Sequence, residues 1–312
     1  VSYIGFNTQE IVFTGQPSIE VQLVDDTQAL DEVVVTALGI KREKKALGYS
    51  MSELKGESLT QTRDANVANA LAGKVAGLQI KQNGTGVGGS SRIVIRGNNS
   101  ITGNNQPLIV VDGVPIDNFS GGTDDYWGNG NVDKGSGISD ISPDDIESMS
   151  VLKGPAASAL YGSRASHGVI LITTKKGTSD KLQITFSTTN SIQTRTKLAD
   201  MLSYDQFVNT IRTQGTSAQQ ALLGTARTNW NDEIYQNAFG TDNNLSVSGK
   251  IAKNWPFRVS VGYYNQSGLL RTDNAERYTG SIMLTPSFFK DHLKLNINAK
   301  GSINNNTFGN TD

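Results

Sequence analysis

The sequence contains no cysteine and only two histidines, His167 and His292, among its 312 residues. Without thiols there is no disulfide framework, no thiolate metal site and no cysteine nucleophile. No second histidine lies near His167 in the sequence, and no nucleophile motif surrounds it, so neither a metal site nor a catalytic triad is indicated. We therefore predict that the chain uses no metal and no cofactor.

Net charge and long apolar runs are also lacking. The formal net charge is -1, which excludes the basic surface typical of a nucleic-acid-binding protein. No run approaches the roughly 18 apolar residues of a transmembrane helix. The strands of a transmembrane β-barrel alternate apolar and polar residues and therefore contain no long apolar run. A membrane location is thus still compatible with the sequence.

Glycine is abundant, with 33 residues, and it punctuates a dense segment between Arg92 and Gly177. Short apolar runs rich in β-branched residues alternate there with single glycines, as buried strands alternate with turns. The runs are Ile93–Ile95, Leu108–Val111, Met149–Leu152 and Gly168–Ile172. This pattern predicts a compact α+β domain.

A short helix is expected just before that segment, over Arg63–Ala72. Val67, Ala70 and Leu71 follow helical spacing, Asp64 is a candidate N-cap, and Gly73 would end the helix.

From Lys181 onward the apolar residues alternate with polar ones, which predicts half-buried strands. The runs are Leu182–Ser187, Leu245–Ile251, Phe257–Tyr264, Tyr278–Thr285 and Leu293–Lys300. With their flanks they approach the roughly ten residues that cross a membrane when tilted, whereas soluble strands average nearer five or six. Because plugged barrels use about 22 strands, we expect an N-terminal portion of a larger protein.

The connections between these runs are expected to alternate in length. The longest spans 195–240, with helical pieces near Tyr204–Arg212 and Ala218–Leu223. Short turns are expected at 253–256 and 289–292, with aromatic residues gathered beside them. Alternating long and short connections are typical of outer-membrane barrels.

Before the glycine-rich segment lies LDEVVVTALGIKREKK, residues 30–45. A short valine run between charged flanks suits strand addition to the open sheet edge of a partner. It equally suits the last strand of a preceding domain or a solvated linker.

Three carboxylates, Asp144, Asp145 and Glu147, raise the alternative of a glycan-cleaving acid/base pair. We favour a turn or a helix start that feeds a strand from Glu147, because Pro143 precedes them. Tyr126 and Trp127 lie in a loop between Asn118 and Asp140. Their rings could stack on a sugar or peptide ligand, but we favour packing on the wall of a barrel.

The strings RIVIRGNNSITGNNQPLIVVDGVPI and DIESMSVLKGPAASALYGSRASHGVILITTKKG resemble the plug domain of SusC/RagA-family TonB-dependent outer-membrane transporters. The resemblance implies an α+β plug followed by antiparallel strands of an incomplete transmembrane barrel. It assigns 1–28 to the last strands of a carboxypeptidase-regulatory-like β-sandwich, 29–45 to the TonB box and linker, 46–178 to the plug, and 179–312 to the barrel.

The resemblance also implies a function, which is TonB-dependent import of a large glycan or peptide nutrient rather than catalysis. The expected location is the outer membrane of a Gram-negative, Bacteroidetes-type bacterium, in contact with outer-membrane lipid. The expected partners are TonB with its ExbB/ExbD motor and a SusD-like surface lipoprotein, with no nucleic acid.

The residues implied for TonB contact are Asp31, Glu32, Val33, Val34, Val35 and Thr36. Four cations, Arg92, Arg96, Lys153 and Arg164, are candidates for polar contacts that hold the plug in a polar lumen. The main rival is a soluble β-rich carbohydrate-binding or adhesion module. It would bury Leu245, Val259 and Ile297 against a second sheet, whereas a barrel would turn them toward lipid.

Overall fold

The protein is described here from a computed structural model. The structure describes residues 21, 33–35, 41–43, 51–61, 63–64, 66–82, 86–101, 105–118, 135–154, 159, 161–177, 180–197, 201–251, 255–290 and 292–308. The sandwich strands expected in 1–28 lie outside these residues, apart from Val21.

Residues 51–177 form an inner domain around a five-stranded sheet with strand order β3-β8-β9-β6-β7. The strands are β3 Met51–Lys55, β6 Leu108–Val111, β7 Val114–Ile116, β8 Ile146–Leu152 and β9 Val169–Thr174. Only β6 and β9 run parallel; the other pairs are antiparallel. A separate hairpin joins β4 Leu78–Gln82 to β5 Ser91–Ile95.

Both faces of the inner sheet are buried, because successive residues of β6 and β9 enter different apolar clusters. Ile109 and Ile170 join the larger cluster, whereas Val110 and Leu171 join the smaller one. Burial on both faces explains why these strands are continuous apolar runs. The predicted α+β domain is confirmed.

Short helical turns cover this sheet. They are α1 Gly56–Thr60 and the 3-10 turns η3 Val67–Leu71, η4 Gly137–Asp140, η5 Pro143–Asp145 and η6 Ser163–Ala165. The helix expected over Arg63–Ala72 is only η3, and its cap is Asn66 rather than Asp64. Asp64 instead accepts hydrogen bonds from the Asn66 backbone and the Asn69 side chain.

Residues 183–307 form a second five-stranded sheet, which we call the wall. Its strands are β10 Gln183–Gln193, β11 Ala238–Ile251, β12 Trp255–Ser267, β13 Asn274–Leu284 and β16 Ile297–Thr307. They pair antiparallel in that order, as predicted. The fifth strand was expected over Leu293–Lys300 and lies further along the chain, because β14 Ser287–Phe288 and β15 Leu293–Lys294 form their own small hairpin.

The wall connections span 194–237, 252–254, 268–273 and 285–296. The short turn predicted at 289–292 is confirmed, because it is the loop between β14 and β15. The whole connection from β13 to β16 is nevertheless longer than the third connection, since it contains that hairpin. The aromatic cluster near the turns is confirmed, since the Trp255 and Phe288 rings meet edge to face with centroids 5.7 Å apart.

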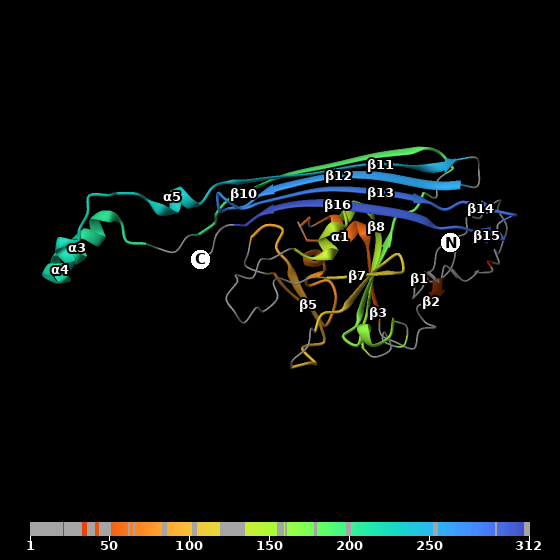
Figure 1. The fold of residues 1–312 in the computed structure, drawn as a ribbon, viewed down its shortest axis with the longest axis horizontal. Helices are drawn as coiled ribbons and strands as arrows, with labels where there is room; N and C mark the ends of the chain where they lie inside the picture. The colour runs from red at the N-terminus through yellow and green to blue at the C-terminus, as the bar shows by residue number, and fades with distance from the viewer. Residues whose placement is uncertain are drawn as a thin grey trace, which may run out of the picture.

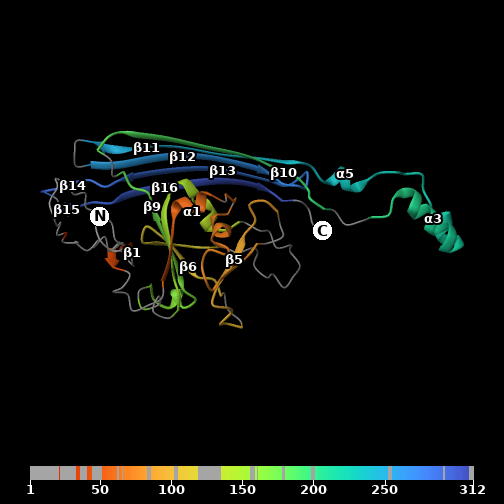
Figure 2. The same cartoon turned by 180° about the vertical axis from the view of Figure 1, so that it is seen from behind.

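The wall is polar on one face and apolar on the other. In β11, Asp242, Asn244, Ser246 and Ser248 are buried, while Phe239, Leu245 and Ile251 are exposed. Figure 1 shows that the inner domain lies on one side of the wall, and hydrogen bonds to Asp242, Arg258 and Lys300 show that this side is the polar face. Figure 2 gives the opposite view, and no second sheet covers the apolar face in the described part of the chain.

The long connection 194–237 carries three helices, α3 Tyr204–Gln214, α4 Ser217–Ala221 and α5 Trp230–Ile234. The first two confirm the helical pieces predicted there. They project beyond one end of the wall, while β14 and β15 lie at the other end (Figures 1 and 2). No helix among the described residues is long and apolar enough to cross a bilayer.

Candidate interface between the inner domain and the wall

Arg63 of the inner domain lies at the centre of the first group of contacts. Its guanidinium donates to both carboxylate oxygens of Asp144, at 2.8 and 2.9 Å. The same two nitrogens donate to wall residues, to Asp242 at 3.0 Å and to the Ser187 hydroxyl at 2.9 Å. Burial opposes the charge, but hydrogen bonds and attraction from both aspartates outweigh it and raise the pKa of Arg63. One arginine therefore ties the η5 turn to β10 and β11.

Asp145, the next residue in η5, makes the second group. It accepts a hydrogen bond from Arg258 at 2.9 Å and one from the Ser260 hydroxyl at 2.6 Å, both on β12. The side chains of Asp145 and Arg258 are each only 10% exposed. A charge at this depth needs its partner while the interface stays closed, because removing the partner leaves the charge buried and uncompensated.

Asp112 makes the third group, at the turn between β6 and β7. Asp112 and Gly113 both have positive φ, 48° and 91°, as a type I′ hairpin turn requires. The turn points the carboxylate at β16, where Lys300 donates at 2.5 Å and Asn298 at 2.8 Å. Burial opposes ionisation of Asp112, but hydrogen bonds from Lys300 and Thr174 prevail and lower its pKa.

A fourth group lies nearer the end of the wall that carries α3–α5. Arg277 on β13 donates to the Ser139 carbonyl, and Asn304 on β16 donates to Asp140 at 2.6 Å. The Val87 N–H donates to Asp273, the residue before β13, at 2.9 Å. The interface thus reaches every wall strand through polar atoms.

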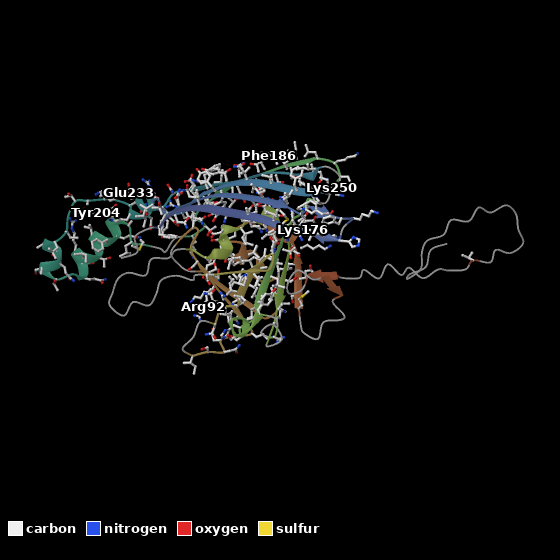
Figure 3. The ribbon with its side chains drawn as sticks, turned by 45° about the vertical axis from the view of Figure 1, so that its right-hand side comes forward. Arg92, Lys176, Phe186, Tyr204, Glu233 and Lys250 are labelled. Carbon is white, nitrogen blue, oxygen red and sulfur yellow. The ribbon has the colours of Figure 1, made fainter. Side chains whose placement is uncertain are left out.

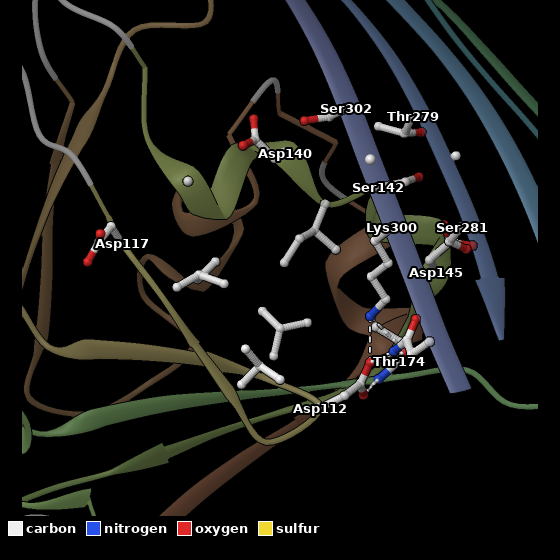
Figure 4. Close-up of a pocket in the computed structure, with 18 of the residues that line it drawn as sticks. Asp112, Asp117, Asp140, Ser142, Asp145, Thr174, Thr279, Ser281, Lys300 and Ser302 are labelled. Atoms are coloured by element: carbon white, nitrogen blue, oxygen red, sulfur yellow. Dashed lines mark hydrogen bonds and ion pairs between the residues drawn. The ribbon is translucent and has the colours of Figure 1, made fainter. Parts of the chain in front are cut away.

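A cavity of about 560 Å³ separates part of the inner domain from β13 and β16. Its charged lining consists of Asp112, Asp117, Asp140, Asp145 and Lys300. Figure 4 shows Lys300 crossing the cavity to meet Asp112 and Thr174. The two domains are therefore joined by discrete contacts, with open space between them.

Three of the four cations singled out from the sequence make side-chain contacts within the inner domain. Arg92 donates to Asn98 at 3.3 Å, Lys153 donates to Ser52 at 2.7 Å, and Arg164 faces Asp117 at 3.5 Å. Figure 3 labels Arg92 on the part of the inner domain away from the wall. Their contact with a lumen wall stays a prediction.

Lys153 is the most buried of the four, at 8% exposure. Burial, and then repulsion from Arg96, lower the pKa of Lys153. No acidic side chain forms an ion pair with either cation within the part of the chain that the structure describes. Arg96 itself has positive φ, at 58°, and its N–H donates to the Gly77 carbonyl.

Of the expected TonB box, Val33–Val35 form strand β1, which pairs antiparallel with β2 Lys41–Glu43. Asp31, Glu32 and Thr36 lie outside the described residues, as do Tyr126 and Trp127. An extended backbone at Val33–Val35 is what strand addition needs.

The carboxylates considered for catalysis have structural partners instead. Asp144 and Asp145 both bind cations at the interface, and Glu147 is exposed on β8. The described residues contain no group of three or more acidic or histidine side chains arranged for a metal ion.

Sequence reasoning missed Arg63, Asp112, Asp140 and the interface role of Asp144 and Asp145. One signal was present, since Asp242, Arg258 and Lys300 occupy the polar positions of alternating strands. Charges on that face indicate a partner of opposite charge. The sequence could not say which inner-domain residue it is.

Residues 43–169 match the TonB-dependent Receptor Plug Domain family. The whole chain is 40% identical, over 312 residues, to the TonB-dependent receptor SusC of Bacteroides thetaiotaomicron, of which it spans 30%. It is 35% identical over 279 residues to the TonB-dependent receptor P3 of Formosa agariphila, covering 89% of this chain and 25% of that protein. The chain therefore spans less than a third of these curated relatives.

Two solved structures share the fold. The RagAB peptide importer in its open-open state aligns with a TM-score of 0.71 and 24% identity, over 89% of this chain and 33% of that one. The siderophore receptor PirA from Acinetobacter baumannii aligns with a TM-score of 0.56 and 21% identity, over 88% of this chain and 34% of that one. An inner domain held against a curved wall is thus the arrangement seen in both.

Proposed function

The chain belongs to the SusC/RagA-type family of TonB-dependent receptors, and we propose that it supplies the plug and first barrel strands of an active importer. The inner domain is the plug, and the wall is part of the barrel that encloses it. The protein would carry a large nutrient, a glycan or a peptide, across the outer membrane of a Gram-negative bacterium of the Bacteroidetes type. We propose a transporter role and no catalytic one.

The observation that carries this proposal is the inverted polarity of the wall. Its polar face is turned inward and is hydrogen-bonded to the plug, while Val261, Ile282 and Ile303 are 56, 55 and 65% exposed on the other face. An apolar outer band around a polar interior is the pattern of a transmembrane barrel. A soluble module would cover that face, because a contiguous apolar surface of this kind promotes aggregation in water.

The interface chemistry suits a plug that must move and return. Its contacts are hydrogen bonds and ion pairs, which water in an opened lumen replaces more readily than it replaces apolar packing. The apolar clusters of the plug lie inside the domain and do not depend on the wall. A pulling force would therefore separate plug from wall before it exposes the core.

We propose that the force reaches the plug through residues 31–36. TonB, driven by ExbB/ExbD, would add a strand to Val33–Val35, with Asp31, Glu32 and Thr36 flanking the contact. Arg92, Arg96, Lys153 and Arg164 would make further lumen contacts to wall strands beyond β16. Lys153 supports that assignment, because it is buried without an acidic partner among the described residues, which is costly for a cation.

On the outer side, we propose a SusD-like lipoprotein that closes the mouth near α3–α5, and outer-membrane lipid around the wall. Tyr126 and Trp127 are proposed ligand contacts.

A peptide pull-down tests the coupling step. A peptide of residues 30–38 is presented to the periplasmic domain of TonB, beside a Val34→Pro version. Proline removes a backbone donor and should abolish binding by strand addition. A Val34→Thr peptide keeps the β-branched shape and the donor, so it should still bind. If none of the three peptides binds, residues 31–36 are a linker, and the proposed coupling is wrong.

A further inference from the structure

The outward face of the wall is ordered in rows, because residues directly opposite on paired strands share a face. One row consists of Phe186, Leu245, Val261, Gly280 and Gly301. The next row toward α3–α5 consists of Thr188, Asn243, Tyr263, Tyr278 and Ile303. The row after that is polar throughout, with Asn190, Thr241, Asn265, Glu276 and Asn305. We call this last set the polar row.

The polar row marks a change in surface chemistry on β12, β13 and β16, where the next outward residues are Ser267, Asn274 and Thr307. On β10 and β11 apolar residues return beyond it, at Ile192 and Phe239. Below it on β12, the outward residues from Trp255 to Tyr263 are apolar or aromatic. That stretch is about 27 Å of strand, or roughly 20 Å of depth at the usual barrel tilt, which is most of a hydrocarbon band. On β12, β13 and β16 the polar row therefore lies where the apolar band gives way to water.

Glu276 is the only charged residue among the described outward positions of these five strands. Its Oε1 accepts from the Tyr278 hydroxyl at 2.8 Å and from the Tyr263 hydroxyl at 3.2 Å, and its Oε2 accepts from Asn305 at 3.4 Å. The two tyrosine rings pack against each other with centroids 5.0 Å apart. The carboxylate is held in place from three sides and is half-buried, and it forms no ion pair with the residues described.

We propose that Glu276, with Tyr263 and Tyr278 beneath it, is a binding site for a lipid headgroup that carries an ammonium group. The inference rests on the proposed function, since it needs the apolar face to lie in a bilayer. Charge complementarity selects the occupant: a fixed carboxylate among neutral amides attracts a cation and repels a bare phosphate. The tyrosine rings offer an aromatic surface on which an ammonium can also rest.

The test uses the intact receptor reconstituted in bilayers that contain equal amounts of phosphatidylethanolamine and phosphatidylcholine, with a chelator present. Lipids that remain bound are counted by native mass spectrometry. Phosphatidylethanolamine offers N–H donors, whereas the quaternary amine of phosphatidylcholine offers none. We expect an excess of phosphatidylethanolamine, and we expect Glu276→Gln to reduce it about two- to fivefold, as for one exposed ion pair.

Glu233→Gln is the matched control, because Glu233 is an exposed carboxylate on α5, away from the wall face (Figure 3). It should leave the lipid ratio unchanged. Equal retention of the two lipids by the unmodified receptor would overturn the inference, as would an unchanged ratio in Glu276→Gln. Retention of phosphate lipids only when a divalent cation is added would also overturn it, in favour of a cation-bridged phosphate. A receptor that does not enter bilayers at all would instead contradict the proposed function.

Discussion

Asp145 of the plug accepts a hydrogen bond from Arg258 of the wall across 113 residues of sequence, at 2.9 Å, with both side chains about nine-tenths buried. The neighbouring Asp144 binds Arg63 of the plug itself, which in turn reaches Asp242 of the wall. Two adjacent carboxylates thus join the domains in different ways, one directly and one through a shared arginine.

The direct pair should dominate the attachment of the plug. Asp145→Asn leaves the Arg258 charge buried without an acidic partner, which costs about 3 to 5 kcal/mol. We expect faster hydrogen exchange in the η5 turn and at the start of β8, measured on the intact receptor by mass spectrometry. Asp117→Asn removes an exposed pair with Arg164, and its effect should be no more than about 1 kcal/mol. Equal exchange in the two variants would contradict the primary role of Asp145.

The ion pair between Asp112 and Lys300 should break at low pH, when Asp112 becomes protonated. The pKa of Asp112 is lower in the folded protein than in the unfolded chain, where it is about 3.9. The stabilisation is therefore complete above that value and is lost as pH falls through the folded pKa. A fluorophore on Val114→Cys, a 63% exposed residue beside the turn, should report detachment of the hairpin from β16 below about pH 4.

Asp112→Asn provides the comparison for that experiment. The variant should show the detached signal already at neutral pH, because Lys300 loses its anionic partner. Its signal should meet that of the parent protein at the lowest pH. Asp180→Asn, which removes an exposed partner of Lys250, should follow the parent curve. A parent protein whose signal does not change with pH would rule out this contact as an acid-sensitive one.

Gly177 should be essential where the plug joins the wall. A Cβ atom at this position would lie 1.9 Å from the Phe257 carbonyl oxygen, a backbone atom that cannot rotate away. Gly177→Ala should cost about 3 kcal/mol or more, seen as loss of heat-resistant folded receptor on a gel. Gly224→Ala meets no atom within 4 Å and should leave the yield unchanged. A normal yield from Gly177→Ala would mean that the junction shifts freely.

Local pattern was enough to predict the plug strands β5, β6, β8 and β9, the alternation of the wall and the helices α3 and α4. Period-two patterning fixes which residues share a face, and apolar runs fix which strands are buried. The fifth wall strand was predicted four residues too early in the chain. Apolar residues at Leu293, Leu295 and Ile297 alternate with polar ones, which is the same pattern that a wall strand shows. Only the β14–β15 pairing shows where the small hairpin ends.

The contacts that hold the plug could not be predicted from the sequence, for a physical reason. Alternation alone showed that Arg258 and Lys300 belong to the polar face of the wall. It could not show that they meet Asp145 and Asp112, because those partners are 113 and 188 residues away and are brought near by strand register and a type I′ turn. The sequence by itself determined most of the elements, their faces and the family; the tertiary structure alone decided which charges meet.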